Sequence, residues 1–240
     1  MKPWTLRPAD DFHLSLRQRL TSLRRETGFV ATLCRAAWWS LVRLYLFAFH
    51  RLEVHGRANL PNVAPFILVA NHASHIDALT LSAGLPMSLC DRTSALAAGD
   101  TFFTHLSISV FAALALNALP IWRRQTKRDH LTQLRERLGE RRSVYLIFPE
   151  GTRSRDGSMA QFKPGLGALV AGTEIPVVPC HIAGAHRAWP PSAPFPRPRK
   201  IALRIGQPII FAEVKNDPEG WRDIAARAES AVRALAPAQP

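Results

Sequence analysis

The sequence predicts an α/β fold, with a largely parallel mixed sheet flanked by helices and an N-terminal helical segment at a membrane interface. Short continuous apolar runs recur along the chain, and amphipathic helical patterns lie between them. Strands that alternate with helices favour a parallel sheet covered on both faces. The chain has 240 residues and is 47% hydrophobic, which is enough for one sizeable core.

The first predicted element is an amphipathic helix over residues 29–49. This stretch is largely apolar but contains Arg35 and Arg43. A charge near the centre of a membrane-spanning helix is costly, so we expect the helix to lie in a membrane interface. The alternative is an ordinary helix packed on the protein's own core. A basic run that would face anionic headgroups precedes it: Arg17, Arg19, Arg24 and Arg25.

This interpretation divides the chain into two regions. Residues 1–50 are predicted to form N-terminal membrane-associated helices, and residues 51–240 the main domain. The first residues show no apolar core followed by a small-residue cleavage site, so a signal peptide is not expected.

Four short apolar runs are predicted to be strands. The first two are apolar at every position, so they are expected to be buried on both faces. Pro179 in the third run is expected at the end or edge of its strand, since proline cannot donate to a sheet ladder. The runs are Pro65–Ala70, Val144–Phe148, Ile175–Ile182 and Ile201–Ile205.

Helical spacing follows between and after these runs. Leucines at 131, 134 and 138 predict an amphipathic helix, and a small-residue helix is expected over Gly165–Ala171. A final helix is predicted around residues 221–232, starting near Asp217 and Pro218. The uncharged stretch Leu106–Ile121 is either a buried helix that runs into a strand or a surface that dips into lipid.

The formal net charge is +13, with a pI near 11.0. Such a surplus indicates an anionic partner: nucleic acid, an anionic membrane surface or a phosphorylated substrate. The cysteines at 34, 90 and 180 form no CxxC pair. A disulfide framework or a structural zinc site is therefore not expected.

The segment Asn71–Asp77 (NHASHID) directly follows the first apolar run. His72 and Asp77 form a general-base pattern, in which the carboxylate orients and stabilises the imidazole. Residues five apart do not share a helix face, so the pair meets only if His72 lies in the loop and Asp77 in the first helical turn. Ser74 and Asp77 also fit a capping box, which would make Asp77 a helix cap without chemistry.

The segment Phe148–Arg155 (FPEGTRSR) follows the second apolar run. Gly151 allows close approach of the backbone to a ligand, Thr152 offers a hydroxyl, and the arginines suit phosphate. A solvated basic turn, with Glu150 paired to an arginine, is the alternative. The spacing differs from that of a Walker A loop. Two further cations are candidates for the same pocket: Arg123 and Lys163.

Together these motifs resemble the glycerolipid acyltransferase family, which includes the 1-acylglycerol-3-phosphate acyltransferases. The resemblance covers about residues 50–210. Its first motif, N-H-x-x-x-x-D, is matched by Asn71, His72 and Asp77, and its third, F-P-E-G-T-R-S, by Phe148–Ser154. Three weaker matches follow the family order: Leu119–Arg123, F-K-x-G at Phe162–Gly165, and the proline-bearing run Ile175–Pro179.

The resemblance implies an enzyme that moves a fatty acyl group from an acyl thioester, on coenzyme A or acyl carrier protein, to a lysophospholipid hydroxyl. It also implies that His72 is the general base and that Asp77 orients it. No metal or cofactor is expected. We guess that the oxyanion donors are backbone N–H groups near His72. The residues implied to hold the acceptor are Arg123, Glu150, Gly151, Thr152, Arg153 and Lys163.

The expected acceptor is 1-acyl-sn-glycerol-3-phosphate, which would give phosphatidic acid, at the cytoplasmic face of the cytoplasmic membrane. Another lysolipid, such as a lyso-ornithine lipid, is an alternative acceptor. A non-enzymatic binder of anionic lipid is a further alternative. Binding of nucleic acid is disfavoured, because the basic residues do not interleave with aromatic residues and no nucleic-acid motif is present. A serine hydrolase is disfavoured because no G-x-S-x-G elbow is present.

Overall fold

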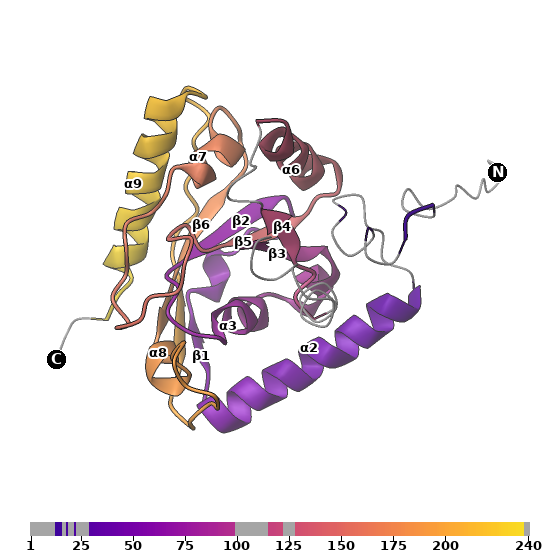
Figure 1. Ribbon diagram of the computed structural model, residues 1–240, viewed down its shortest axis with the longest axis vertical. Coiled ribbons are helices and arrows are strands. Elements are labelled where there is room, and N and C mark those ends of the chain that lie inside the picture. The colour runs from indigo at the N-terminus through magenta and orange to yellow at the C-terminus, as the bar shows by residue number, and fades with distance from the viewer. Residues whose placement is uncertain are drawn as a thin grey trace.

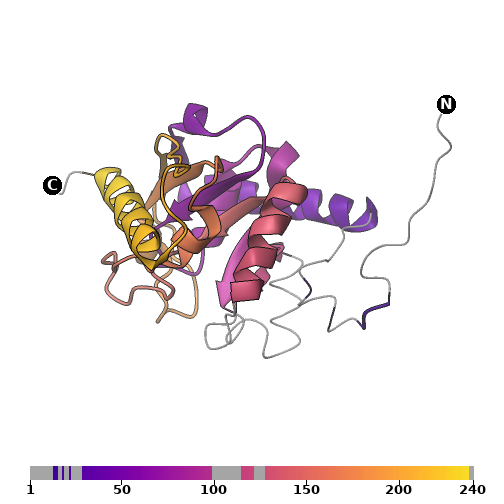
Figure 2. The same cartoon turned by 90° about the horizontal axis from the view of Figure 1, so that it is seen from above.

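Helices cover both faces of one β-sheet (Figures 1 and 2). The computed structural model describes residues 13–15, 18, 22, 29–98, 115–121 and 128–237. Within these ranges seven strands form the sheet, in the order β1-β7-β6-β2-β5-β3-β4. The predicted α/β class with a largely parallel mixed sheet is therefore confirmed.

Every strand pairing in the sheet is parallel except that of β6 with β7. The central strand β2 lies between β5 and β6 and runs in the same direction as both. We call the edge at which these three strands end the carboxyl edge, and the opposite one the amino edge. The strands are β1 (Glu53–His55), β2 (Phe66–Ala70), β3 (Thr93–Ala98), β4 (Leu119–Ile121), β5 (Val144–Ile147), β6 (Val177–Ala183) and β7 (Ala202–Ile205).

Alternate residues of β2 face opposite helical layers. Phe66, Leu68 and Ala70 belong to one core cluster, whereas Ile67 and Val69 belong to the other. None of the five is more than 1% exposed. A strand buried on both faces must be apolar at every position, which explains why the continuous apolar runs predicted strands correctly.

The first core cluster joins the sheet to α2 (Phe29–His50), α3 (Asp77–Gly84), the 3-10 helix η2 (Met87–Arg92) and α8 (Ala185–Ala188). The second joins it to α6 (Arg128–Glu140), α7 (Gly165–Val170) and α9 (Pro218–Ala234). A short 3-10 helix, η1 (Arg57–Asn59), follows β1. The predicted cap of α9 is confirmed, since Asp217 accepts a 2.8 Å hydrogen bond from Gly220 N–H.

The two arginines that interrupt the apolar N-terminal stretch face the protein. Arg35 is 6% exposed and pairs with Asp91 at 2.9 Å. The Arg43 guanidinium donates to the carbonyl oxygen of Leu85. Their neighbours on the buried face of α2 pack into the core: Trp39, Val42 and Leu46. Both guanidinium groups therefore donate to the layer beneath α2, that of Arg35 to a carboxylate and that of Arg43 to a carbonyl.

The outward face of α2 is apolar. Its large exposed side chains range from 37% to 65% exposed and are Leu33, Leu41, Leu44, Phe47 and Phe49. Among the described residues, no helix combines the length and the hydropathy that crossing a membrane requires. The location of α2 in a membrane interface stays a prediction. The basic run before α2 lies outside the described residues.

Pro179 lies inside β6, opposite Val69 of β2, so its expected place at a strand end or sheet edge is wrong. The ladder from β6 to β7 stops at the pair Cys180–Ile205 and continues only as an isolated bridge. Between these points the Pro179 carbonyl accepts a 2.8 Å hydrogen bond from Gly206 N–H. The missing N–H of proline therefore falls where the ladder is already interrupted.

Two strands, β1 and β3, were not predicted, and β4 was predicted only in one of the two interpretations of Leu106–Ile121. β1 and β4 have three residues each, too few for a periodic pattern. β3 reads TSALAA, and its small residues have little strand preference. Of the ambiguous stretch Leu106–Ile121, only residues 115–121 are described, and their end forms β4.

A glycine fixes the contact between α7 and α9. A Cβ at Gly167 would lie 2.8 Å from the carbonyl oxygen of Trp221, whereas one at Gly139 in α6 would meet nothing within 4 Å. We predict that Gly167→Ala lowers the free energy of unfolding by about 1–3 kcal/mol through overpacking. Gly139→Ala should instead raise it, by up to about 1 kcal/mol, through helix propensity. Urea unfolding of both variants tests this, and equal stabilities would contradict the packing.

Candidate active site

His72 and Asp77 meet at the carboxyl edge of the sheet. His72 lies between the end of β2 and the start of α3, and its Nδ1 is 2.9 Å from Asp77 Oδ2. A carboxylate oxygen only accepts, so Nδ1 holds the hydrogen and Nε2 keeps a lone pair. The His72 side chain is 20% exposed and that of Asp77 is 2% exposed. The buried Asp77 carboxylate thus orients the imidazole through Nδ1, while part of the ring stays accessible to solvent.

The same Asp77 oxygen also accepts from the backbone N–H groups of Ala73 and Ser74, each at 2.7 Å. The chain after His72 therefore wraps around this carboxylate, and α3 begins only at Asp77. This loop lets residues five apart in sequence meet. The predicted capping box is incomplete, because the N-cap residue of α3 is Ile76 and the Ser74 hydroxyl donates to the carbonyl of Trp189.

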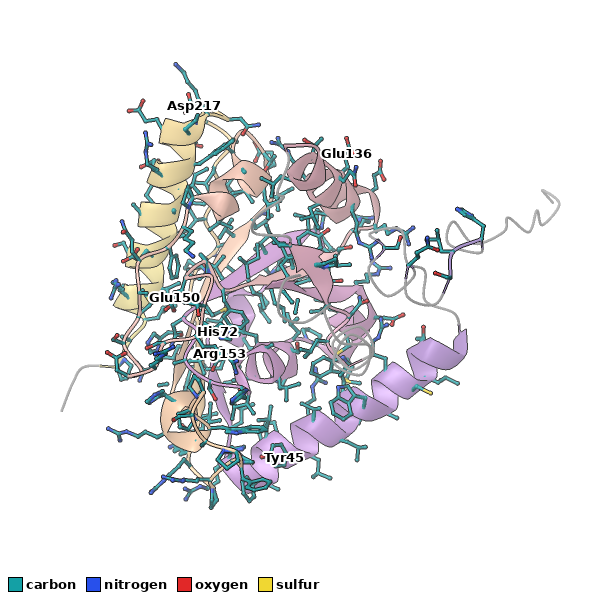
Figure 3. All side chains as sticks on the ribbon, viewed as in Figure 1. Tyr45, His72, Glu136, Glu150, Arg153 and Asp217 are labelled. Atoms are coloured by element: carbon teal, nitrogen blue, oxygen red, sulfur yellow. The ribbon has the colours of Figure 1, made fainter. Side chains whose placement is uncertain are left out.

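The second motif is joined to the first through Glu150 (Figure 3). His72 N–H donates to Glu150 Oε1 at 2.7 Å, and Ser154 N–H donates to the His72 carbonyl at 2.8 Å. The Phe148 ring stacks on the His72 ring, with centroids 4.1 Å apart and planes inclined by 18°. The two loops that follow β2 and β5 therefore form one unit around the imidazole.

Glu150 serves this loop–loop contact. Its side chain is buried at 2% exposure, and its second oxygen accepts Ala160 N–H at 3.0 Å. Burial raises the pKa of Glu150, against the opposing effect of the two backbone hydrogen bonds. Both oxygens are occupied by backbone donors, and a buried carboxylate repels phosphate. Glu150 therefore positions His72, and its geometry gives no support to the predicted contact with an acceptor phosphate.

The cationic side of the site lies on the turn after β5. Gly151 has a φ of 74°, and a Cβ there would lie 2.9 Å from Lys163 Nζ, so the lysine side chain crosses the turn directly over this glycine. Thr152 and Lys163 are exposed, and Arg153 is partly exposed. Arg123 lies outside the described residues. The turn presents the Thr152 hydroxyl and the Arg153 guanidinium, and the Lys163 side chain joins them from outside the turn.

Arg153 is connected to the first motif by His75. The Arg153 guanidinium donates to His75 Nδ1, and His75 Nε2 lies 3.4 Å from the carbonyl of Pro191. The His75 ring also tilts against Trp189, with centroids 5.1 Å apart. Burial and the neighbouring Arg153 lower the pKa of His75, which favours the neutral ring that can accept from Arg153.

The segment that carries both motifs matches a family of known proteins. The model of the acyltransferase family matches residues 51–183, which include both loops. The chain belongs to the acyltransferase family. The family prediction made from the motifs is confirmed.

Several curated relatives of this acyltransferase-family chain are similar over its central part. Chloroplastic 1-acyl-sn-glycerol-3-phosphate acyltransferases of Brassica napus and Arabidopsis thaliana are each 30% identical over 159 residues. These matches cover 65% of this chain and 43% and 42% of the relatives. The mouse alpha protein of that name is 30% identical over 139 residues, covering 56% of this chain and 46% of the relative. The chain thus spans less than half the length of these relatives.

The fold is shared with solved structures. The crystal structure of the 1-acyl-sn-glycerophosphate acyltransferase from Thermotoga maritima aligns with a TM-score of 0.62 and 24% identity. The alignment covers 85% of this chain and 78% of that chain. The likeness supports the α/β architecture described above.

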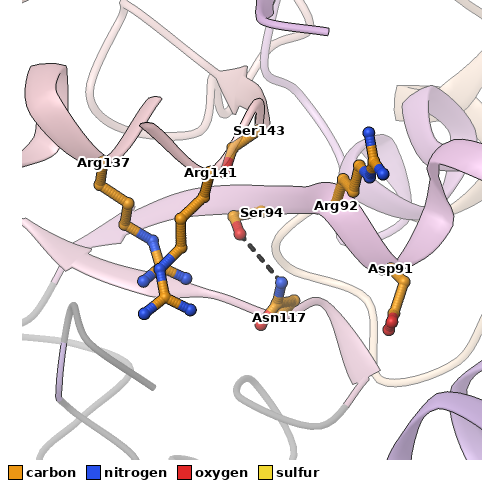
Figure 4. Close-up of a pocket in the computed structure, with 7 residues that line it drawn as sticks. All are labelled: Asp91, Arg92, Ser94, Asn117, Arg137, Arg141 and Ser143. Atoms are coloured by element: carbon orange, nitrogen blue, oxygen red, sulfur yellow. Dashed lines mark hydrogen bonds between the residues drawn. The ribbon is translucent and has the colours of Figure 1, made fainter. Parts of the chain in front are cut away.

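A separate cavity of about 280 Å³ lies at the amino edge of the sheet (Figure 4). Its lining residues lie before or at the start of β3, β4 and β5. The cavity is therefore at the edge opposite the one where His72 lies. The lining residues are Asp91, Arg92, Ser94, Asn117, Arg137, Arg141 and Ser143. Among the described residues, no group of three His, Cys, Asp or Glu side chains is placed to hold a metal ion.

The sequence did not predict the supporting role of three residues around this site. Asn71 links the end of β2 to β6, since its side chain donates to Ile182 O at 3.0 Å and accepts Ile182 N–H at 2.8 Å. The stacking of Phe148 on the His72 ring was not predicted. Nor was the hydrogen bond from the Ser74 hydroxyl to the carbonyl of Trp189, which is 115 residues away in sequence. The position of Asn71 beside His72 was the one available signal; the other contacts depend on tertiary structure.

Proposed function

We propose that this protein transfers a fatty acyl group from an acyl thioester, on coenzyme A or acyl carrier protein, to the hydroxyl of a lysophospholipid. The observation that carries the proposal is the His72 imidazole, oriented by Asp77 and adjoining a cationic turn. The names of the relatives favour 1-acyl-sn-glycerol-3-phosphate as acceptor, with phosphatidic acid as product.

In this mechanism His72 Nε2 accepts the proton of the acceptor hydroxyl as its oxygen attacks the thioester carbonyl. A C–O bond forms and a tetrahedral oxyanion results. The C–S bond then breaks, and the thiolate takes the proton from the imidazolium. Asp77 stabilises the imidazolium through Nδ1–H, and such base assistance contributes about 10²–10⁴-fold to a rate.

The acceptor phosphate is proposed to lie on the turn after β5. Arg153 supplies a fork of N–H donors, Lys163 a point charge and Thr152 a hydroxyl, with Arg123 completing the site. Binding of the phosphate away from the reacting centre orients the hydroxyl toward Nε2. Gly151 keeps the backbone of the turn open to Lys163.

Backbone N–H groups next to His72 cannot stabilise the oxyanion. Those of His72, Ala73 and Ser74 donate to Glu150 and Asp77, and that of His75 donates to the Trp189 carbonyl. The oxyanion donors expected near His72 are therefore not these four groups. The carboxylates that position His72 occupy those donors.

The first prediction concerns the base. His72→Ala should lower kcat by about 10²–10⁴-fold without changing the urea midpoint, because general-base assistance is lost. Asp77→Asn keeps an oxygen for the three donors but removes the charge that stabilises the imidazolium. Its kcat should fall by roughly 10- to 100-fold, equivalent to about 1.5–3 kcal/mol.

Thiol release from an acyl thioester and lysophosphatidic acid, with the product identified by mass, measures both effects. A panel of other lysolipids identifies the acceptor. Undiminished turnover in folded His72→Ala would end the proposal.

The second prediction concerns the phosphate. Arg153→Ala should raise the acceptor KM by roughly 10-fold or more, as expected for loss of a charged hydrogen bond worth about 1.5–3 kcal/mol. Arg155→Ala, which removes an exposed cation two residues away, is the matched control and should leave the acceptor KM unchanged. Both variants should keep the wild-type KM for the thioester. Equal acceptor KM values for the two variants would remove Arg153 from the phosphate site.

We also propose that the protein binds to the cytoplasmic face of the cytoplasmic membrane through α2. The outward face of this helix carries exposed leucine and phenylalanine side chains, while its arginines are turned inward. A helix with this distribution buries its apolar face at the boundary between headgroups and acyl chains. The proposed acceptor is itself a membrane lipid, so this location supplies the substrate.

The third prediction tests this membrane contact. Leu44→Asp should lower partitioning onto lipid vesicles by roughly 10-fold or more, because the apolar burial of an exposed leucine is lost. Val63→Asp is the matched control: Val63 is also 65% exposed, but it precedes β2 at the amino edge. Vesicle co-sedimentation measures both, and equal partitioning of the two variants would contradict a contact through α2.

A further inference from the structure

The segment between α8 and β7 displays a phenylalanine to solvent. This segment, Trp189–Lys200, contains five prolines and is called the proline loop here. Phe195 within it is 76% exposed, more than any other exposed large hydrophobic side chain of the described residues. A phenylalanine displayed in this way costs free energy in water and marks a contact surface when other features adjoin it.

The proline loop is held in one conformation. The Trp189 indole N–H donates to the Ala193 carbonyl at 2.9 Å, and Arg197 N–H donates to the Ala188 carbonyl at 2.8 Å. The prolines restrict the backbone further. Phe195 is therefore presented on a preorganised support, so that contact with a partner loses little conformational entropy.

The loop lies at the carboxyl edge, beside the active site. β6 runs parallel to β2, so the chain after β6 emerges at the edge where His72 lies. The Trp189 carbonyl, at the start of the loop, accepts the Ser74 hydroxyl at 2.6 Å and His75 N–H at 3.3 Å. The proline loop is thus bonded directly to the segment that carries the catalytic pair.

The other end of the proline loop adjoins the end of α2, as Figure 1 shows below α8. His50 donates from Nδ1 to the Arg199 carbonyl at 3.1 Å and accepts from the Tyr45 hydroxyl at Nε2, at 3.0 Å. Ile201 N–H returns a hydrogen bond to the His50 carbonyl at 3.1 Å. The exposed Phe49 precedes His50 and packs on its ring. The loop therefore extends the apolar face of α2 toward the active site.

The loop is also cationic. Arg197 and Arg199 are exposed, and neither takes part in a salt bridge within the described chain. Lys200 is paired with Glu53 at 2.7 Å, so its charge is partly compensated. The sequence from residue 185 to residue 200 contains no acidic residue. A phenylalanine flanked by uncompensated arginines is complementary to an apolar layer with an anionic surface.

We propose that the proline loop is a second membrane contact, which inserts Phe195 into an anionic phospholipid bilayer and places Arg197 and Arg199 on lipid phosphates. This inference deepens the proposed function and rests on it, because it supposes a lipid acceptor. Together with α2 it gives two membrane attachment points, which adjoin each other where His50 ends α2 and bonds to Arg199. The loop's bonds to Ser74 and His75 then hold the base against the bilayer from which the acceptor enters.

The test measures binding apart from catalysis. All variants are made in the full-length chain carrying His72→Ala, and partitioning onto vesicles of neutral phosphatidylcholine, with or without phosphatidylglycerol, is determined by co-sedimentation. Phe195→Ser removes the apolar contact, and Arg197→Gln with Arg199→Gln removes two charges. The controls are Val63→Ser at the amino edge and Arg222→Gln on α9, both exposed.

Phe195→Ser should lower partitioning by roughly 10-fold or more on both kinds of vesicle. The double arginine variant should lower it by roughly 30-fold on anionic vesicles and leave it unchanged on neutral ones. Unchanged partitioning of either loop variant, or equal losses in its control, would overturn the proposal. A change in self-association without a change in vesicle binding would overturn it in favour of a contact between copies.

Activity separates this inference from the proposed function. With His72 restored, the loop variants should lose turnover of a bilayer-embedded acceptor in proportion to lost binding. They should keep wild-type turnover of a short-chain acceptor present as a monomer in solution. Equal loss of turnover with both acceptors would overturn the membrane role of the loop. Absence of turnover in every form of the protein, wild type included, would contradict the acyltransferase proposal and leave the vesicle-binding result intact.

Discussion

One carboxylate oxygen organises the active site. Asp77 Oδ2 accepts three hydrogen bonds, from the His72 ring and from two successive backbone N–H groups. Burying an ionised carboxylate costs several kcal/mol unless such donors offset the loss of water. The three donors fix the path of the chain between β2 and α3 and the tautomer of the imidazole in one arrangement. The positions of the helix start, the loop and the base therefore depend on the same interaction.

Two buried carboxylates have structural roles, while the exposed groups are left for the substrate. Glu150 joins the loop after β5 to the backbone of His72, and its burial raises its pKa. Lys163 is exposed and Arg153 partly exposed, so both side chains are accessible to the proposed acceptor phosphate. Asn71 ties the same corner to β6, whose continuation into the proline loop connects the site with α2. The candidate base, the proposed acceptor site and the proline loop thus lie at one edge of the sheet.

The sequence predicted what local pattern controls. Continuous apolar runs located the strands buried on both faces, and motif spacing located the His72–Asp77 pair. The strand β1 was not predicted, because three residues are too few to show a periodic pattern. The role of Glu150 could not be read locally, since a carboxylate among arginines resembles an ion pair until its backbone donors are known. Likewise, only the packing of α2 shows that Arg35 faces inward, onto Asp91.

The central claim is that Asp77 fixes His72 as a neutral base with its proton on Nδ1. Nitrogen-15 NMR of the ring, with the signal assigned by its loss in His72→Ala, tests this directly at neutral pH. The account predicts a protonated Nδ1 with resolved coupling to its hydrogen and an Nε2 shift typical of an unprotonated nitrogen. A ring protonated at Nε2, or one that exchanges rapidly between tautomers, would show that the carboxylate does not hold the imidazole.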